Sequence, residues 1–293
     1  MSQQVDELAT LLHGRRTLVL SGAGISTESG IPDYRSPERT ARRHKPMTYQ
    51  QFVGDDASRR RYWARSMIGW GAMDRARPNS GHTALAQMAA LGALAGLITQ
   101  NVDGLHQKAG SGEVLELHGS LASIYCLGCR VLTPRREIQR RLLELNPHLE
   151  DAAAVTAPDG DAHLAEHLIE RVVIPDCRCC GGVLKPDVVF FGENVPKERV
   201  VRCERLLDGS DVLLVVGSSL TVMSGMRWTL AAQRQQKPLA IINDGPTRAD
   251  ATCALKIEGR LGQVLPALAS QLSEANRAAC PCSSAEIWPP SGR

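Results

Sequence analysis

The chain has little net charge and no long apolar segment, and these two absences exclude broad classes of protein. Its 34 basic and 31 acidic side chains leave a formal charge of +3 at pH 7, whereas binding to nucleic acid needs basic residues concentrated on one face. No segment approaches the roughly 18 uninterrupted apolar residues that a membrane-spanning helix requires. We therefore expect neither nucleic acid nor a membrane among the partners of this protein.

The N-terminal residues also lack the features of a secretory signal. The segment Met-Ser-Gln-Gln-Val-Asp-Glu-Leu has neither a basic region nor an apolar region, so we expect a cytoplasmic protein. The 293 residues, of which 43% are hydrophobic, are enough for one large domain or two smaller ones. Two basic clusters, at residues 39–45 and 59–61, are interpreted as solvated faces, and we expect a monomer.

A glycine-containing turn follows the first predicted strand. The run Thr17–Leu20 is apolar and partly β-branched, which predicts a buried strand leading into Gly22-Ala23-Gly24. Glycines allow backbone N–H groups to approach a diphosphate closely, and a following helix N-terminus adds a favourable dipole. The pattern indicates a dinucleotide site.

Two features of an ordinary hydride-transferring dehydrogenase are missing around this turn. Thr27 stands where the third small residue of its fingerprint would be. An acidic residue about 20 positions further on would bind the ribose, but that region reads Arg42-Arg43-His44. The turn runs instead into a cluster of charged residues that includes Asp33 and Arg35. We therefore predict that the dinucleotide is a reactant and not a hydride carrier.

Further predicted strands are mostly continuous apolar runs separated by helical lengths. Such runs favour a parallel sheet that is covered on both faces. Helices are expected at Val5–Leu12 and from Gly81 onward. The expected strands are Gly96–Thr99, Val114–Leu117, Val188–Phe191, Asp211–Gly217, Pro238–Asn243 and Ala254–Ile257. The predicted core is therefore an α/β fold with a doubly wound parallel sheet.

Two C-x-x-C pairs, Cys126–Cys129 and Cys177–Cys180, indicate a metal site. Each pair can offer two thiolates from one tight turn, and together they complete a tetrahedral zinc shell. Cys179 leaves the second pair ambiguous, although the two glycines after Cys180 suit a tight turn and favour Cys180. Four thiolates leave no open position for water. We therefore predict one structural zinc ion.

Two segments interrupt the alternation of strands and helices and are predicted to be insertions into a Rossmann-like core. Residues 39–77, rich in Arg, Tyr and Trp, are expected to form a helical insertion, and residues 123–183, with five of the nine cysteines, a smaller zinc-binding module. The Rossmann-like dinucleotide-binding domain then comprises residues 1–38, 78–122 and 184–270. Residues 271–293 are predicted to be a disordered tail, in which Cys280 and Cys282 have no obvious partners.

Polar residues follow several of these strands at the edge where doubly wound sheets bind ligands. Asn101 and Asp103 come after one strand and His118 after the next. An isolated histidine there is more often structural. Combined with the other loops, His118 becomes the leading candidate for a general base, because imidazole can take a proton near neutral pH. The loops Gly217–Leu220 and Asn243–Gly245 supply small residues suited to packing against ribose or adenine.

Taken together, these motifs resemble the sirtuin family over roughly residues 14–268. The matching segments are Gly22–Ser26, Gly30–Arg35, Thr99–Asp103, His118-Gly119, the two C-x-x-C pairs, Lys185–Glu193 and Gly217–Leu220. Arg15, Lys185–Glu193 and Pro246-Thr247-Arg248 make the chain look most similar to the class II branch, the bacterial and mitochondrial relatives of human sirtuin 4.

The resemblance implies an NAD-dependent protein-lysine deacylase. In this family the acyl oxygen attacks the anomeric carbon of the nicotinamide ribose, and nicotinamide leaves. A histidine matching His118 then acts as base on a ribose hydroxyl, and free lysine and 2′-O-acyl-ADP-ribose are formed. Asn101 is assigned a catalytic role beside His118. Contacts to NAD are expected from Gly22, Ala23, Gly24, Ser26, Ile31, Asp33, Arg35, Gln100, Asn101, Asp103, Gly217, Ser218, Ser219, Asn243, Asp244, Gly245 and Leu261, the last standing where relatives often carry Cys.

The resemblance also implies an acylated protein or peptide substrate that adds as an extended strand and is recognised largely through its backbone. Its expected contacts are Val188, Phe190, Gly192, Glu193, Leu220 and Val222. Tyr62 and Arg65 share one face if residues 39–77 are helical, and they resemble the pair that grips an acidic acyl group in desuccinylating sirtuins. An ordinary surface pair is the alternative. We predict a preference for larger or acidic acyl groups over acetyl.

Two other functions are compatible with these motifs. In an NAD-dependent mono-ADP-ribosyltransferase, a protein side chain would attack the same ribose carbon, and the same pocket could serve. A zinc-module binding protein that only senses NAD would keep its activity without His118. Radiolabelled ADP-ribose retained on protein would identify the transferase.

Overall fold

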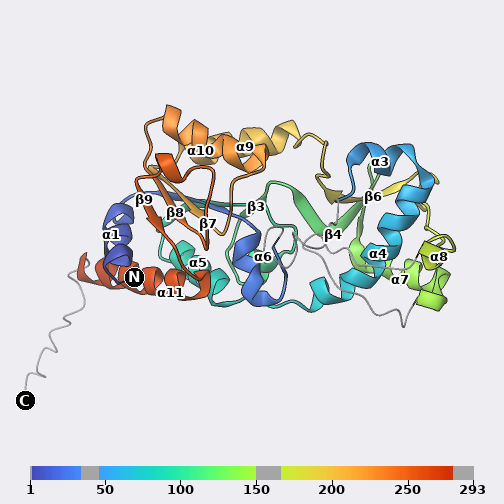
Figure 1. The fold of residues 1–293 in the computed structure, drawn as a ribbon, viewed down its shortest axis with the longest axis horizontal. Helices are drawn as coiled ribbons and strands as arrows, with labels where there is room; N and C mark the ends of the chain where they lie inside the picture. The colour runs from blue at the N-terminus through green and yellow to red at the C-terminus, as the bar shows by residue number, and fades with distance from the viewer. Residues whose placement is uncertain (1, 34–45, 150–165, 280–293) are drawn as a thin grey trace, which may run out of the picture.

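The structure is a computed structural model that describes residues 2–33, 46–149 and 166–279. Its larger part is built on a parallel sheet of six strands in the order β3-β2-β1-β7-β8-β9 (Figure 1). The strands are β1 (Thr17–Ser21), β2 (Leu94–Thr99), β3 (Val114–Glu116), β7 (Val212–Val216), β8 (Leu239–Ile242) and β9 (Leu255–Ile257). The strand order reverses between β1 and β7, which creates the crevice where such sheets bind ligands.

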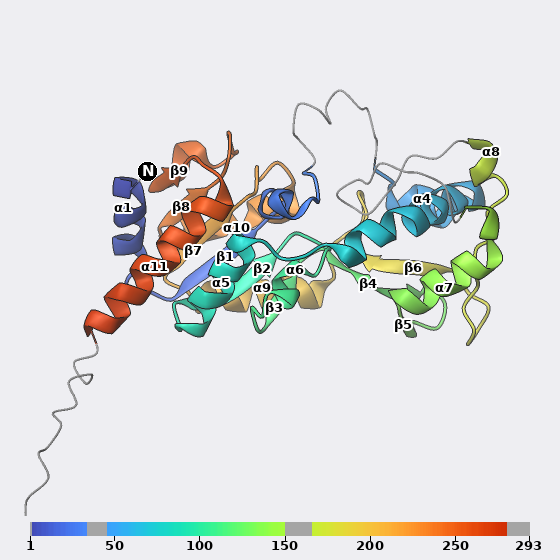
Figure 2. The same ribbon diagram turned by 90° about the horizontal axis from the view of Figure 1, so that it is seen from below.

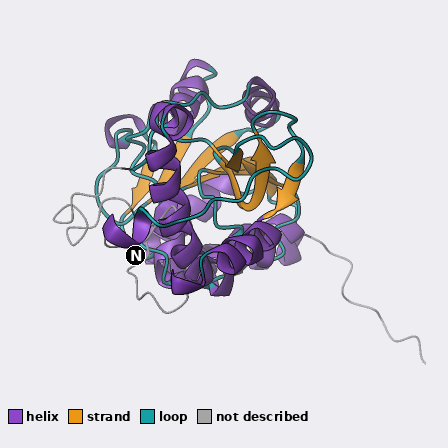
Figure 3. Cartoon of the chain, turned by 90° about the vertical axis from the view of Figure 1, so that its right-hand side faces the viewer, coloured by secondary structure: helices purple, strands orange, loops and turns teal. Residues whose placement is uncertain are grey.

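Both faces of the sheet are buried, as the apolar runs predict. In β1, Val19 packs into one core cluster, while Leu18 and Leu20 pack into another. The first face is covered by α1 (Ser2–Leu12), α5 (Ser80–Ala90) and α11 (Leu261–Ala279), and the second by α9 (Lys197–Asp208) and α10 (Met223–Arg234). Helices α5 and α11 lie side by side (Figure 2). Seen from the end, helices lie above and below the strands (Figure 3).

A smaller unit is built on an antiparallel sheet of three strands in the order β5-β4-β6. These strands are β4 (Gly119–Cys126), β5 (Leu132–Pro134) and β6 (Leu184–Val188). Around them lie α3 (Tyr49–Gly54), α4 (Asp56–Arg75), α7 (Arg135–Leu145), η2 (Pro147–Leu149) and α8 (Glu166–Ile169). Phe52, Trp63 and Leu142 join these elements in one apolar core. Three short elements, η1 (Ala23–Ser29), α6 (Leu105–Lys108) and η3 (Asp250–Thr252), lie in loops of the larger unit.

Side-chain caps fix where two helices begin. Asp55 accepts hydrogen bonds from the N–H groups of Ala57 and Ser58 at the start of α4. The Asn79 side chain accepts from the first N–H groups of α5, and its amide donates to the Ile25 carbonyl at 2.7 Å. Asn79 therefore fixes α5 against the segment that follows β1.

The strand predicted at Val188–Phe191 is wrong both in its position and in the sheet to which it belongs. The strand is β6, which ends at Val188 and pairs antiparallel with β4 instead of joining the parallel sheet. Lys185 and Pro186 made this segment look unlike a buried strand. The Lys185 side chain is nevertheless only 1% exposed, because its charge is paired inside the smaller unit.

The predicted boundaries also differ from the structure. The junction at residues 122 and 123 falls inside β4, and β6 lies in the part assigned to the Rossmann-like domain. Because β4 and β6 pair with each other, both belong to the smaller unit. Disorder from residue 271 is wrong as far as residue 279, since α11 continues there and buries Leu272. Within the described residues, no helix has the length and apolar character needed to cross a membrane.

Candidate active site

A cavity of about 1910 Å³ lies at the carboxyl end of the parallel strands and is lined by residues of both units. Of the residues predicted to bind NAD or act in catalysis, those lining it are Gly22, Ala23, Gly24, Ser26, Ile31, Asp33, Gln100, Asn101, Asp103, His118, Gly217, Ser218, Ser219, Asn243, Asp244 and Leu261. Those predicted to bind substrate and lining it are Tyr62, Val188, Phe190, Gly192, Glu193, Leu220 and Val222. Gly245 and Arg65 do not line the cavity, and Arg35 lies outside the described residues.

The glycines of the first turn hold two loops together. Gly22 N–H donates to the Val216 carbonyl and Gly24 N–H to that of Gly217, at 3.0 and 2.8 Å. A Cβ atom on Gly22 would lie 2.7 Å from the Cβ of Ser218, too close for any other residue. These two N–H groups are therefore engaged within the protein, while both glycines still line the cavity, and their contact with NAD stays a prediction. Glycine is required because the turns after β1 and β7 are in contact.

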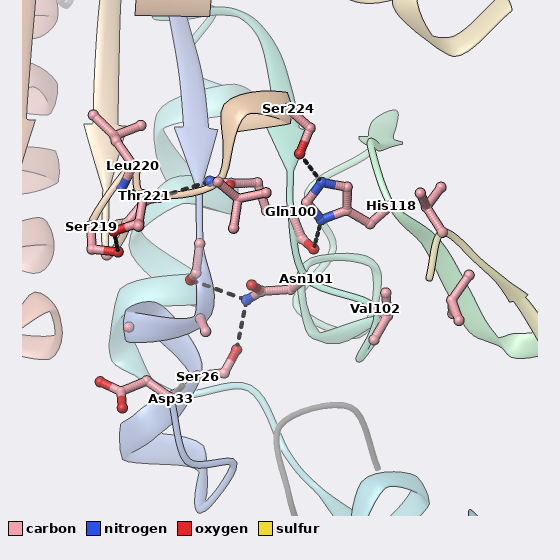
Figure 4. Close-up of a pocket in the computed structure, with 18 of the residues that line it drawn as sticks. Ser26, Asp33, Gln100, Asn101, Val102, His118, Ser219, Leu220, Thr221 and Ser224 are labelled. Atoms are coloured by element: carbon pink, nitrogen blue, oxygen red, sulfur yellow. Dashed lines mark hydrogen bonds between the residues drawn. The ribbon is translucent and has the colours of Figure 1, made fainter. Parts of the chain in front are cut away.

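The loop after β2 carries a network of polar side chains (Figure 4). The Asn101 amide donates to the Gly22 carbonyl at 3.2 Å and to the Ser26 hydroxyl at 3.1 Å. Ser26 in turn donates to the Asp103 carboxylate at 2.7 Å. Asn101 is only 8% exposed, so its carbonyl and the Asp103 carboxylate have fixed positions at the wall of the cavity. Fixed polar groups of this kind can orient a bound amide without reorganising.

The loop after β7 presents a hydroxyl group to the cavity. Ser218 Oγ accepts hydrogen bonds from the Gln100 amide at 2.8 Å and from the Leu220 N–H at 3.3 Å. Because both of these groups are donors, the hydroxyl proton of Ser218 remains to donate to an acceptor such as a phosphate oxygen. After β8, Asn243 donates to the Gly245 carbonyl at 3.0 Å. Gly245 therefore shapes this loop from outside the cavity.

His118 lies between a backbone carbonyl and a hydroxyl group. Its Nδ1 is 2.9 Å from the Gln100 carbonyl oxygen, and its Nε2 is 2.7 Å from Ser224 Oγ. A carbonyl can only accept, so Nδ1 carries the proton and Nε2 of the neutral ring is the acceptor. Burial lowers the pKa of His118 below its usual 6.5, and the nearby Arg199 guanidinium acts in the same direction. The ring is therefore neutral at pH 7, with a basic nitrogen at the cavity.

A buried ion pair organises the segment after β6. Lys185 Nζ lies 3.0 Å from Glu193 Oε2 and donates to the Val188 carbonyl at 2.6 Å. The same carboxylate oxygen accepts the Phe190 N–H at 2.9 Å, and the Phe190 ring centre lies 4.6 Å from Nζ. Residues 188–193 are thus held in one conformation along the cavity. Burial lowers the pKa of Lys185, and the Glu193 carboxylate opposes that shift.

The cavity has an apolar wall on the side of the smaller unit. The rings of Tyr62 and Phe190 meet edge to face with centres 5.2 Å apart. Both line the cavity together with Ile31, Val102 and Leu121. The structure thus brings Tyr62 to the cavity without Arg65, although both lie on α4.

The four cysteines of the two C-x-x-C pairs form one cluster. Their sulfur atoms all lie within 4.8 Å of one another, with Cys126 and Cys180 at 3.4 Å and Cys129 and Cys177 at 3.7 Å. A tetrahedral zinc–thiolate site has sulfur atoms about 3.8 Å apart, so the quartet fits one zinc ion. The exposed Cys179 is not part of it.

Reasoning from the sequence overlooked two polar residues of the site. Lys185 lies within a segment that was recognised, but a lysine gives no sign that it is buried. Ser224 comes two residues after Val222, and only its position after a strand end could have suggested it. None of the four clustered cysteines lines the cavity, so the metal site and the candidate active site are separate.

Comparison with known proteins gives one consistent family. Residues 22–224 match the model of the Sir2 family. NAD-dependent protein deacetylase 1 of Streptomyces coelicolor is 53% identical over 265 residues, 90% of this chain and 89% of that protein. Its counterpart in Mycobacterium avium is 51% identical over 272 residues, 91% of this chain and 95% of that protein. The chain therefore belongs to the Sir2 family, the sirtuins.

Solved structures agree with this assignment. A Sir2–p53 peptide–NAD⁺ complex has a TM-score of 0.69 and 28% identity, covering 94% of this chain and 99% of that one. A Sir2 homologue bound to NAD has a TM-score of 0.71 and 28% identity, covering 92% and 94%. The predicted family and α/β fold class are confirmed. The class II assignment stays a prediction.

Proposed function

We propose that this protein is an NAD-dependent protein-lysine deacylase in which His118 is the general base. The observation that carries the proposal is the position of His118 Nε2, a neutral acceptor at a cavity that is also lined by Asn101 and Asp103. Relatives that are 53% and 51% identical over about nine-tenths of this chain are named NAD-dependent protein deacetylases, which supports it. The two C-x-x-C pairs bind zinc away from the reaction.

The residues around the cavity fit the steps of this reaction. The diphosphate of NAD would lie beside the loops after β1 and β7, where Ser218 can donate a proton to it. Asn101 and Asp103 would orient the nicotinamide carboxamide while the acyl oxygen displaces nicotinamide from the ribose. His118 then takes the proton of a ribose hydroxyl at Nε2, which makes that oxygen a better nucleophile toward the acyl carbon. The substrate backbone would pair with residues 188–193 and 217–222.

The acyl group would lie against the apolar wall formed by residues such as Tyr62 and Phe190. The predicted preference for acidic acyl groups depended on Arg65, which does not line the cavity. We therefore propose that uncharged acyl groups are preferred over glutaryl or succinyl. A preference for chains larger than acetyl stays a prediction.

Mass spectrometry of the products tests this function. The protein is incubated with NAD and peptides carrying acetyl, longer uncharged acyl, succinyl or glutaryl lysine. Formation of acyl-ADP-ribose is expected, fastest with an uncharged acyl group. Faster turnover of glutaryl peptides would contradict the proposed acyl preference. Nicotinamide release without acyl-ADP-ribose, with labelled ADP-ribose retained on protein, would contradict deacylation and indicate ADP-ribosyl transfer.

The pH dependence of turnover should reflect the lowered pKa of His118. The neutral ring is the active form, so activity is lost as the pH falls through the pKa. Because burial lowers that pKa below its usual 6.5, we expect kcat to fall on the acidic side with a midpoint below pH 6.5. A profile of kcat between pH 5 and 8.5 measures this. An acidic limb centred above pH 7 would contradict it.

Replacing Lys185 with methionine should weaken both stability and peptide binding. Lys185→Met keeps the length of the side chain but leaves the Glu193 carboxylate without its buried partner. We expect the free energy of unfolding to fall by about 3 kcal/mol and KM for the peptide to rise, with little change in KM for NAD. The double variant Lys185→Met/Glu193→Gln should recover stability but not peptide KM. Equal changes in both KM values would contradict the assignment of Lys185 to the peptide-binding segment.

A further inference from the structure

Ser224 is a cavity residue to which the proposed reaction gives no role. It stands in the first turn of α10, is half-buried, and lines the cavity. Its hydroxyl oxygen lies 2.7 Å from His118 Nε2, although 106 residues separate the two in the sequence. Figure 4 shows Ser224 on one side of the imidazole ring and Gln100 on the other. The base is therefore held at both nitrogens.

The two hydrogen bonds of the His118 ring run in opposite directions, because the ring donates one and accepts the other. The Gln100 carbonyl accepts from Nδ1–H and selects the tautomer. Since Nε2 of that tautomer has only a lone pair, the Ser224 hydroxyl must donate to it. With both nitrogens engaged, rotation of the ring about its side-chain bonds breaks two hydrogen bonds. The ring is then fixed with its basic nitrogen at the cavity before any ligand arrives.

We propose that Ser224 is a positioning residue for His118, which holds Nε2 unprotonated and in place to meet a ribose hydroxyl. This rests on the proposed function of His118 as base. A ribose hydroxyl is chemically the same kind of donor as the Ser224 hydroxyl, so one can replace the other at Nε2. The serine thus keeps the site in its reactive arrangement between turnovers.

Other charged groups near His118 act on its pKa independently of Ser224. Arg199 of α9 lies close enough to disfavour protonation of His118, and it is itself paired with Asp187 of β6 at 2.9 Å. Glu116 of β3 lies beside Arg199 and Asp187, and burial raises its own pKa. None of these groups changes when Ser224 is replaced. The effect of a serine variant on His118 can therefore be assigned to the lost hydroxyl.

The test compares Ser224→Ala, Ser224→Thr and the wild-type protein. A hydrogen bond donated to the neutral ring stabilises the neutral form, so the pKa of His118, followed by NMR of its ring in the ligand-free protein, should rise in Ser224→Ala. Acyl-ADP-ribose formation should fall by about 3- to 10-fold, the factor expected for one hydrogen bond. Exchange of labelled nicotinamide, which precedes the base step, should change less than about 2-fold. Ser224→Thr, which keeps a hydroxyl group, should restore both values.

A control variant on the same helix separates this role from a structural one. Thr229 donates its hydroxyl to the Met226 carbonyl at 2.8 Å and does not line the cavity, so Thr229→Val should leave the pKa of His118 unchanged. An unchanged pKa of His118 in Ser224→Ala, or equal losses of nicotinamide exchange and acyl transfer, would overturn the proposal. The NMR measurement needs no turnover. It therefore still decides the role of Ser224 if the wild-type protein forms no acyl-ADP-ribose.

Discussion

Replacing His118 with alanine is expected to lower the rate of acyl-ADP-ribose formation by about 10²- to 10⁴-fold, the usual contribution of a general base. Nε2 is the acceptor that faces the cavity, and a methyl group cannot take a proton in its place. Departure of nicotinamide needs no base, so exchange of labelled nicotinamide should persist. Single-turnover assays that follow nicotinamide and acyl-ADP-ribose separately measure the two steps.

The zinc content of His118→Ala should equal that of the wild-type protein, because none of the clustered cysteines lines the cavity. Unchanged zinc and an unchanged thermal midpoint would show that the loss is chemical and not a failure to fold. Wild-type rates of acyl transfer in His118→Ala would refute the base assignment and favour a protein that only senses NAD. Equal loss of both steps would place His118 in NAD binding instead. The smaller loss of activity expected for Ser224→Ala should affect the same step, the formation of acyl-ADP-ribose.

Much of the larger unit could be predicted because its signals are local. β7 is a continuous apolar run, and successive residues such as Val212 and Leu213 pack on opposite faces of the sheet, as expected for a strand buried on both sides. The zinc quartet was also predictable, since each pair of thiolates comes from one short turn. In these cases residues near one another in the sequence determine the feature, and the spacing alone identifies it.

The features that could not be predicted concern contacts between distant segments. β6 contains Lys185, whose burial depends on Glu193 and on aromatic rings from other elements, so hydrophobicity could not reveal the strand. The N–H groups of Gly22 and Gly24 are used by the β7 turn, nearly 200 residues away in the sequence. Helical spacing put Tyr62 and Arg65 on one face, but only Tyr62 reaches the cavity. In each case a partner from another segment determines what the residue does.

Loss of one zinc ligand is expected to have the largest effect on stability. Cys177→Ser removes one of four thiolates and should reduce bound zinc from one ion per chain to nearly none. Structural zinc contributes on the order of 10 kcal/mol of binding free energy in small peptides, so the thermal midpoint of the smaller unit should fall sharply. Elemental analysis of the purified protein and thermal unfolding with and without added zinc measure these effects.

Cys179→Ser provides the matched control, because Cys179 is exposed and outside the cluster. It should retain one zinc ion and wild-type stability.

The activity of Cys177→Ser should fall as zinc is lost, even though none of the clustered cysteines lines the cavity. The reason is that the cluster lies where β4 ends at Cys126, which pairs with Leu184 of β6, whereas Gly119 and Val188 pair at the opposite end of the same ladder, beside His118. Loss of zinc at one end of the β4–β6 pair therefore loosens the two strands that position His118 and residues 188–193. Full zinc retention in Cys177→Ser, or zinc loss in Cys179→Ser, would instead assign the fourth ligand to Cys179.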